Sequence, residues 1–291
     1  MGLDMNATPS ERLERLCGES SADWIRTAPG GKGLQRAEAF FEGHAYDAHR
    51  HDSYAIGMTL QGVQAFRYRG VETHSLGGQV FVLHPDELHD GHAGGGTGFR
   101  YRILYVDPAA IHEALGEAWT PLPFVREVVG AHPRIAAVLA RAFADFKRPL
   151  EDLQRDDIVA DLAEELAAAD PTVRRPLPLR HWRAALAARE LLETTLERSV
   201  TSPELETAAG LSRYAVARAF RACFGTSPHW YGVLQRLRRA RTLLTEGVPL
   251  VDVAAACGFA DQSHMTRQFK QAYGVPPGRW AALGVQGQTK S

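Results

Sequence analysis

LETAAGLSRYAVARAFRACFGTSP, residues 205–228, recurs in altered form as VAAACGFADQSHMTRQFKQAYGVPP, residues 253–277. Gly210 of the first copy corresponds to Gly258 of the second, and Phe220, Gly225 and Pro228 each recur 49 residues later. Two copies are too few for a solenoid, which needs at least three repeats. We therefore interpret the pair as one supersecondary unit that has been duplicated.

Each copy predicts a short helix, a tight turn and a second helix. The first helix consists of small residues and ends at a glycine, which readily adopts the left-handed backbone that closes a helix. The second helix opens at Ser212 or Asp261, both favourable N-cap residues, and ends at Gly225 or Gly274. Apolar residues recur on one face of each second helix at the spacing of an amphipathic helix. The pattern is that of two helix-turn-helix units.

The outer faces of the two second helices carry side chains suited to DNA. Alignment on the phenylalanines superposes Arg218 on Arg267 and Arg221 on Lys270. Arginine pairs with guanine in the major groove, and basic side chains neutralise phosphates. The candidate DNA-binding residues are Arg213, Tyr214, Ala217, Arg218, Arg221, Gln262, Ser263, His264, Thr266, Arg267 and Lys270. A single exposed arginine ordinarily indicates only a solvated helix face. Two sets of basic residues at matching positions of the repeat favour double-stranded DNA as the partner.

Charge is distributed unevenly along the chain. Residues 180–291 carry a net charge of +7 and residues 1–179 a net charge of −8, although the whole chain sums to −1. A basic domain is the electrostatic footprint of a nucleic-acid binder. The helix expected at 228–244 would be about 27 Å long, so it would hold the two second helices near one DNA turn, about 34 Å, apart.

The first part of the chain predicts a different architecture. Residues 38–107 form short segments rich in Tyr, Phe, Val and Ile, separated by glycine-rich turns, as in a β-sandwich or barrel. From residue 121 to 169 the apolar spacing becomes helical, beginning with Phe124, Val125 and Val128, and predicts two or three helices. We expect a barrel at 1–110, helices at 111–169, a proline-rich linker at 170–180 and a helical DNA-binding domain at 181–291.

The repeat, together with GFADQSHMTRQFKQAYGVPPGRW (258–280), resembles the DNA-binding domain of the AraC/XylS family of transcriptional regulators over about residues 183–283. The resemblance implies seven helices, with Tyr214, Arg218, Gln262, Ser263 and Arg267 facing bases; Ala217 is smaller than the polar residue often found at its position. The first 110 residues resemble, less specifically, the cupin-like β-barrel sensor of that family. The expected fold class is therefore α+β with two domains.

Histidines gather in AHRHDSY (48–54) and in HPDELHD (84–90) of the barrel. His49 and His51 point to the same face of a strand, and His89 can approach them from another strand. Three imidazoles suit an open zinc or iron site, but no Glu follows His51 by three or four residues as in metal-binding cupins. We expect no metal and no other cofactor, and instead a ligand-binding pocket. Its candidate residues are His49, His51, Tyr54, His84 and His89.

The expected function is sequence-specific regulation of transcription under the control of a small-molecule effector, without catalysis. The family resemblance implies RNA polymerase as a partner and favours an activator, and the helices at 111–169 are expected to form a homodimer. The chain has no apolar run near 20 residues and its N-terminus has no signal-peptide pattern, so we expect a cytoplasmic protein without membrane contact.

Two enzyme classes compete with this expectation. One is a metal-dependent cupin enzyme that would use His49, His51 and His89. The other is an alkyl-transfer DNA repair protein, which needs a reactive cysteine. Only Cys17 lies upstream of the repeat, and Cys223 and Cys257 fall on inward faces of expected helices.

Overall fold

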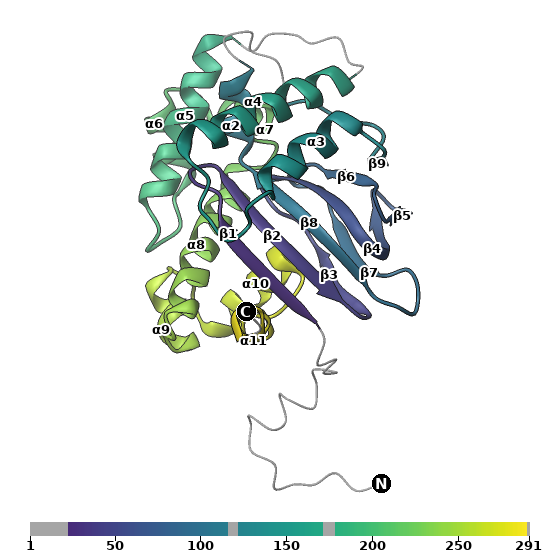
Figure 1. The fold of residues 1–291 in the computed structure, drawn as a ribbon. Helices are drawn as coiled ribbons and strands as arrows, with labels where there is room; N and C mark the ends of the chain where they lie inside the picture. Colours follow the sequence, from purple (N-terminus) through teal and green to yellow (C-terminus); the bar gives the residue numbers. More distant parts are fainter. Residues whose placement is uncertain (1–22, 116–121, 171–177, 290–291) are drawn as a thin grey trace, which may run out of the picture.

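The computed structural model describes residues 23–115, 122–170 and 178–289; Cys17 and most of the expected linker lie outside these ranges. A β-rich N-terminal domain is followed by a helical C-terminal domain (Figure 1). The expected α+β class with two different halves is confirmed. Among the described residues, no helix is long and apolar enough to cross a membrane.

Antiparallel strands build the N-terminal domain around one long central strand. The strands are β1 (Trp24–Pro29), β2 (Leu34–Phe41), β3 (His44–His49), β4 (Tyr54–Tyr68), β5 (Val71–Leu76), β6 (Val80–Leu83), β7 (His89–Ala93), β8 (Phe99–Val106) and β9 (Val129–Gly130). One sheet runs β1-β2-β8-β4-β6-β9. The second half of β4 leaves that sheet to pair with β5 and β7, and β7 pairs with β3. Strand β4 therefore joins two sheets that face each other.

Strand β8 shows why the sheet has two buried faces. Phe99, Tyr101 and Ile103 point into the space between the sheets, whereas Leu104 and Val106 point to the other side, toward helices. This alternation has the period of two that a strand imposes. The helices that cover this outer face are α2 (Pro108–Ala114), α3 (Pro133–Ala142) and α4 (Asp152–Ala169) (Figure 1).

The helical expectation was wrong for the beginning of the segment at 121–169. Phe124, Val125 and Val128 lie in a non-helical stretch that leads into β9. The barrel satisfies the backbone here, because Val82 N donates to Val128 O at 2.8 Å and the Tyr54 hydroxyl donates to Pro123 O at 2.7 Å. An apolar stretch packed on a sheet can show helical spacing by chance, and the prolines in it disfavour a helix.

Seven helices follow in the described part of the C-terminal domain, as the family resemblance implied. They are α5 (Leu179–Thr194), α6 (Ser202–Ala209), α7 (Arg213–Phe224), α8 (Pro228–Thr245), α9 (Leu250–Ala256), α10 (Gln262–Tyr273) and α11 (Pro277–Thr289). Ser212 and Asp261 are the N-cap residues of α7 and α10, and the Asp261 carboxylate accepts a hydrogen bond from His264 N at 2.6 Å. Both helices end at left-handed glycines, Gly225 and Gly274.

Each helix-turn-helix unit has its own core. Phe220 and Cys223 are buried in the first unit, and Phe269 and Cys257 in the second. Both thiols are free, and burial raises the pKa of Cys223 to about 12. A thiol held protonated in this way is a poor nucleophile at neutral pH.

Candidate functional site

The expected DNA-reading residues lie on α7 and α10, the second helices of the two units. Tyr214 is 64% exposed, which is unusual for so large a ring. Arg213, Arg218, Arg221, Gln262, Ser263, Arg267 and Lys270 are exposed, whereas Ala217, His264 and Thr266 are half-buried. The structure therefore places equivalent polar faces on two equivalent helices, each available to a partner along most of its length.

The C-terminal end of α10 packs against strand β3 of the barrel. Gly274 O accepts a hydrogen bond from Asp47 N at 2.9 Å, and Gln271 O accepts one from Arg50 N at 3.1 Å. The Lys270 ammonium lies 2.7 Å from the Asp47 carboxylate and holds the pKa of Asp47 below its usual value. One of the expected DNA contacts is thus paired with the N-terminal barrel.

The C-terminal end of α7 packs against the segment that follows β6. A Cβ atom at Gly225 would lie 2.7 Å from Pro85 Cβ. The Asp86 carboxylate beside it lies 3.7 Å from Arg50, and its burial raises its pKa while Arg50 and Arg221 oppose that rise. Each of the two histidine-bearing segments therefore touches one helix-turn-helix unit.

Partly buried ion pairs cross the junction between the domains. Arg238 of α8 lies 2.7 Å from Asp52, whose side chain is 5% exposed. Burial raises the pKa of Asp52, and the Arg238 charge opposes the rise. Arg189 of α5 lies 3.0 Å from Asp107. Removing one partner of a buried pair leaves an uncompensated charge, so these contacts hold the domains in one arrangement.

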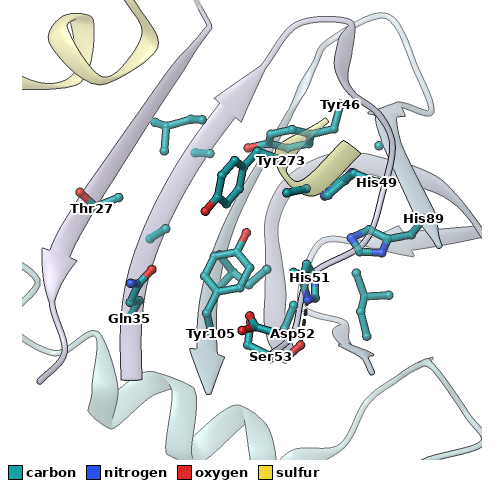
Figure 2. Close-up of a pocket in the computed structure, with 18 of the residues that line it drawn as sticks. Thr27, Gln35, Tyr46, His49, His51, Asp52, Ser53, His89, Tyr105 and Tyr273 are labelled. Carbon is teal, nitrogen blue, oxygen red and sulfur yellow. Dashed lines mark hydrogen bonds between the residues drawn. The ribbon is translucent and has the colours of Figure 1, made fainter. Parts of the chain in front are cut away.

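A cavity of about 250 Å³ lies at this junction. The barrel contributes His49, His51, His89 and several aromatic residues, and Figure 2 shows Tyr46, Tyr105 and Tyr273 beside them. Helices α8, α10 and α11 contribute Arg238, Arg241, Tyr273 and Trp280. The DNA-binding domain thus forms part of the cavity wall.

Three of the five expected ligand residues meet at this cavity. The ring centroids of His49 and His89 are 4.3 Å apart, those of His51 and His89 4.8 Å, and those of His49 and His51 6.2 Å. Burial lowers the pKa of each ring to about 3, and the neighbouring imidazoles add to this effect. All three rings are therefore neutral at physiological pH.

The hydrogen bonds of these rings fix their tautomers. Nδ1 of His49, His51 and His89 lies 2.8, 2.8 and 2.9 Å from the carbonyl oxygens of Asp47, Ser53 and Glu87. Because a carbonyl oxygen can only accept, each Nδ1 carries the proton, and each Nε2 presents a lone pair. Among the described residues, no group of three or more His, Cys, Asp or Glu side chains is placed to hold a metal ion.

The other two expected ligand residues do not line the cavity. His84 Nδ1 lies 2.9 Å from the Tyr68 hydroxyl, and its Nε2 accepts a hydrogen bond from Val125 N at 2.9 Å. Tyr54 is fully buried and donates to the backbone. Both side chains are bonded within the core of the barrel.

Sequence reasoning missed several cavity residues. Tyr105 follows Tyr101 and Ile103 at the strand period of two, so alternation along β8 could have identified it. No local signal could have identified Arg241, Tyr273 or Trp280, because they reach the cavity only through the packing of the two domains.

Comparisons with known proteins agree with this architecture. Residues 32–163 match the AraC-like ligand binding domain, and residues 205–282 match a helix-turn-helix domain. The chain is therefore a transcriptional regulator that combines an AraC-like ligand-binding domain with a helix-turn-helix DNA-binding domain.

Its relatives include the uncharacterized HTH-type transcriptional regulator YbfI of Bacillus subtilis, which is 28% identical over 75% of this chain and 80% of that protein. The regulator GbdR of Pseudomonas aeruginosa is 33% identical over 30% of this chain, but this match spans only 24% of GbdR. The structure of ToxT from Vibrio cholerae shares the fold, with a TM-score of 0.63 at 12% identity over 87% of this chain and 99% of that one.

Proposed function

We propose that the protein binds promoter DNA sequence-specifically through α7 and α10, and that a small-molecule effector in the junction cavity controls this binding. The single observation that carries the proposal is the composition of the cavity wall, which comes from both domains. A ligand that contacts both walls binds differently when the domains move apart. Such a difference in affinity is what shifts a population between two states.

The contacts between the domains couple the effector cavity to the helices that bind DNA. Both reading helices end on the sensor, at Gly225 and Gly274, so a change in the cavity alters how the two helices are held. Base contact is assigned to Tyr214, Arg218, Gln262, Ser263 and Arg267, whose outward faces support it. Arg213, Ala217, Arg221, His264, Thr266 and Lys270 complete the proposed DNA surface.

Further parts of the proposal rest on the family. We assign a regulatory rather than an enzymatic role, activation with RNA polymerase as partner, and action in the cytoplasm. ToxT from Vibrio cholerae has been crystallised with a bound unsaturated fatty acid, which supports a small-molecule ligand in this fold as well. The helices within 111–169 are proposed to form a homodimer, which sedimentation would reveal as twice the chain mass of 31.9 kDa.

Filling the cavity tests the proposal. Ala37→Leu places extra volume against the cavity wall, and Ala144→Leu makes the same change on the surface. A reporter under an operator selected by the protein should respond to growth conditions with wild type and Ala144→Leu. Ala37→Leu should bind the operator in vitro with wild-type affinity and give a constant reporter level. An unaltered response of Ala37→Leu would contradict effector control through this cavity.

A further inference from the structure

Building on the proposed function, we propose that the effector is a small hydroxylated acid, whose anionic group binds Arg241 and whose hydroxyl groups donate to acceptors of the cavity wall that include the imidazoles of His49, His51 and His89. The inference rests on which polar groups of the cavity have partners within the protein.

Arg241 lines the cavity and, in the part of the chain that the structure describes, has no carboxylate as a counter-ion. Arg238, one helical turn away on α8, is paired with Asp52 at 2.7 Å. Among the described residues, no carboxylate lies within ion-pair distance of Arg241, and its buried Nε has no hydrogen-bond partner. Its guanidinium lies 5.1 Å from the centroid of Tyr273 and 4.8 Å from that of Trp280. A guanidinium held in place between two rings suits an anionic group of a ligand.

A second set of cavity groups consists of buried acceptor atoms without a donor as partner. His51 Nε2, Asp52 Oδ2 and Gln64 Oε1 are buried and have no partner, and the three residues are 7%, 5% and 8% exposed. All three atoms are acceptors. Oδ2 and Oε1 are carboxylate and amide oxygens, and His51 Nε2 carries a lone pair because the proton of that ring is on Nδ1. Leaving buried acceptors unpaired is costly. A ligand that contacts these three atoms must therefore offer several donors.

Tyr105 connects the two parts of the cavity. Its ring centroid lies 5.6 Å from that of His51, and the Arg241 charge acts on its hydroxyl. His51 and Arg241 line one cavity of about 250 Å³, so one small molecule can contact both groups. The aromatic rings along the wall suit the carbon backbone of a hydroxylated chain or ring, which presents C–H groups between its hydroxyls.

Other ligand classes leave part of the cavity unsatisfied. A simple fatty acid would pair with Arg241 but would place C–H groups against the three acceptors. A neutral polyol would satisfy the acceptors and leave Arg241 without an anion. An amine would meet the acceptors, but Arg241 would repel it. A molecule with both an anion and hydroxyl donors complements both parts.

Four six-carbon compounds separate these classes by calorimetry on the full-length protein. Gluconate carries a carboxylate and hydroxyls, sorbitol replaces the carboxylate by a hydroxyl, glucamine replaces it by an ammonium group, and hexanoate lacks the hydroxyls. We expect gluconate to bind about tenfold or more tightly than each of the others. Equal or weaker binding of gluconate, or no binding of gluconate at millimolar concentration, would overturn the proposal.

Variants assign the anion contact. Arg241→Met keeps the apolar stem against Tyr273 and Trp280 and should reduce gluconate binding to the level of sorbitol. Arg239→Met is the matched control, because Arg239 pairs with Glu197 instead of lining the cavity. Undiminished gluconate binding by Arg241→Met would overturn the assignment. Operator binding is measured separately: a protein that binds its operator but not gluconate refutes the effector class alone, whereas one that selects no operator refutes the proposed function.

Discussion

Arg218 and Arg267 occupy equivalent positions on α7 and α10, and both are exposed. An arginine that reads a guanine contributes to discrimination among sequences, whereas one that only contacts phosphate contributes equally to all of them. Replacing a base-reading arginine therefore weakens binding mainly to the operator, whereas replacing a phosphate-contacting arginine weakens binding to every DNA sequence.

Arg218→Ala and Arg267→Ala should each weaken binding to the selected operator by about 1–3 kcal/mol and relax the preference at one base position. Fluorescence anisotropy with operators substituted at single positions would measure this. Arg134→Ala, an exposed arginine on α3 of the sensor, is the control for removing a positive charge. Equal weakening on operator and unrelated DNA would assign both residues to phosphate contact.

The buried histidines make stability depend on pH. His49, His51, His84 and His89 each have a pKa of about 3 in the folded protein, against an ordinary value of 6.5. Between these values the unfolded chain binds more protons than the folded protein. Their contribution to stability is therefore fully present above pH 6.5 and is lost as the pH falls toward 3.

Urea unfolding at pH 7.0 and 5.5 should show this loss, at about 1.4 kcal/mol per pH unit for each histidine well below pH 6.5. His89→Gln should reduce the difference between the two pH values. His74→Gln, at an exposed position of β5, is the control for replacing a histidine. The same pH dependence in His89→Gln and wild type would contradict the account of this cluster.

At the scale of elements, the docking of α10 on β3 occupies part of the DNA surface. Asp47→Asn removes the counter-ion of Lys270 and should raise operator affinity in the absence of effector about two- to fivefold, as expected for an exposed ion pair worth up to about 1 kcal/mol. Asp161→Asn breaks a similar pair with Arg141 inside the sensor and should leave the affinity unchanged. Anisotropy measures both, and a lower affinity of Asp47→Asn would mean that the contact favours the DNA-binding state.

Two glycines at helix ends allow the cost of a strained backbone to be measured separately from the cost of disturbing the domain contact. Gly210 and Gly274 both have a positive φ, +63° and +71°. A Cβ atom at Gly210 meets nothing within 4 Å, whereas one at Gly274 would lie 2.7 Å from Tyr46 Cβ. Both Gly→Ala variants should lose about 1 kcal/mol from backbone strain, and Gly274→Ala should lose about 1–3 kcal/mol more from the clash. If both variants lose the same free energy of unfolding in urea, the contact between Gly274 and β3 adjusts to a methyl group without loss of stability.

The sequence predicted elements well where local signals agree. N-cap residues, closing glycines and helical periodicity coincide in both copies of the repeat, so α7 and α10 begin and end where expected. At Phe124, Val125 and Val128 the helical prediction rested on periodicity without an N-cap or closing glycine. Hydrogen bonds to the barrel hold this stretch in a non-helical conformation instead. His49 and His51 meet at the cavity as expected, although His51 lies beyond the end of β3 and not on the strand. Spacing did not show that His84 would be bonded to Tyr68 and Val125 within the core.

For the whole molecule, the packing of the two domains creates the cavity and positions both reading units. This arrangement depends on contacts between residues far apart in the sequence, such as Arg238 with Asp52 and Gly274 with Asp47. Periodicity and composition carry no information about such pairs. The junction was consequently beyond prediction from the sequence, although each half of it was recognisable.

The most direct test of the central claim is selection of genomic DNA fragments by the full-length protein at physiological salt, beside the double variant Arg218→Ala/Arg267→Ala. We expect wild type to enrich fragments with two half-sites about 10 base pairs, one helical turn, apart, and the double variant to lose this enrichment. Enrichment of the same fragments by both proteins, or of none by wild type, would contradict sequence-specific reading of DNA through α7 and α10.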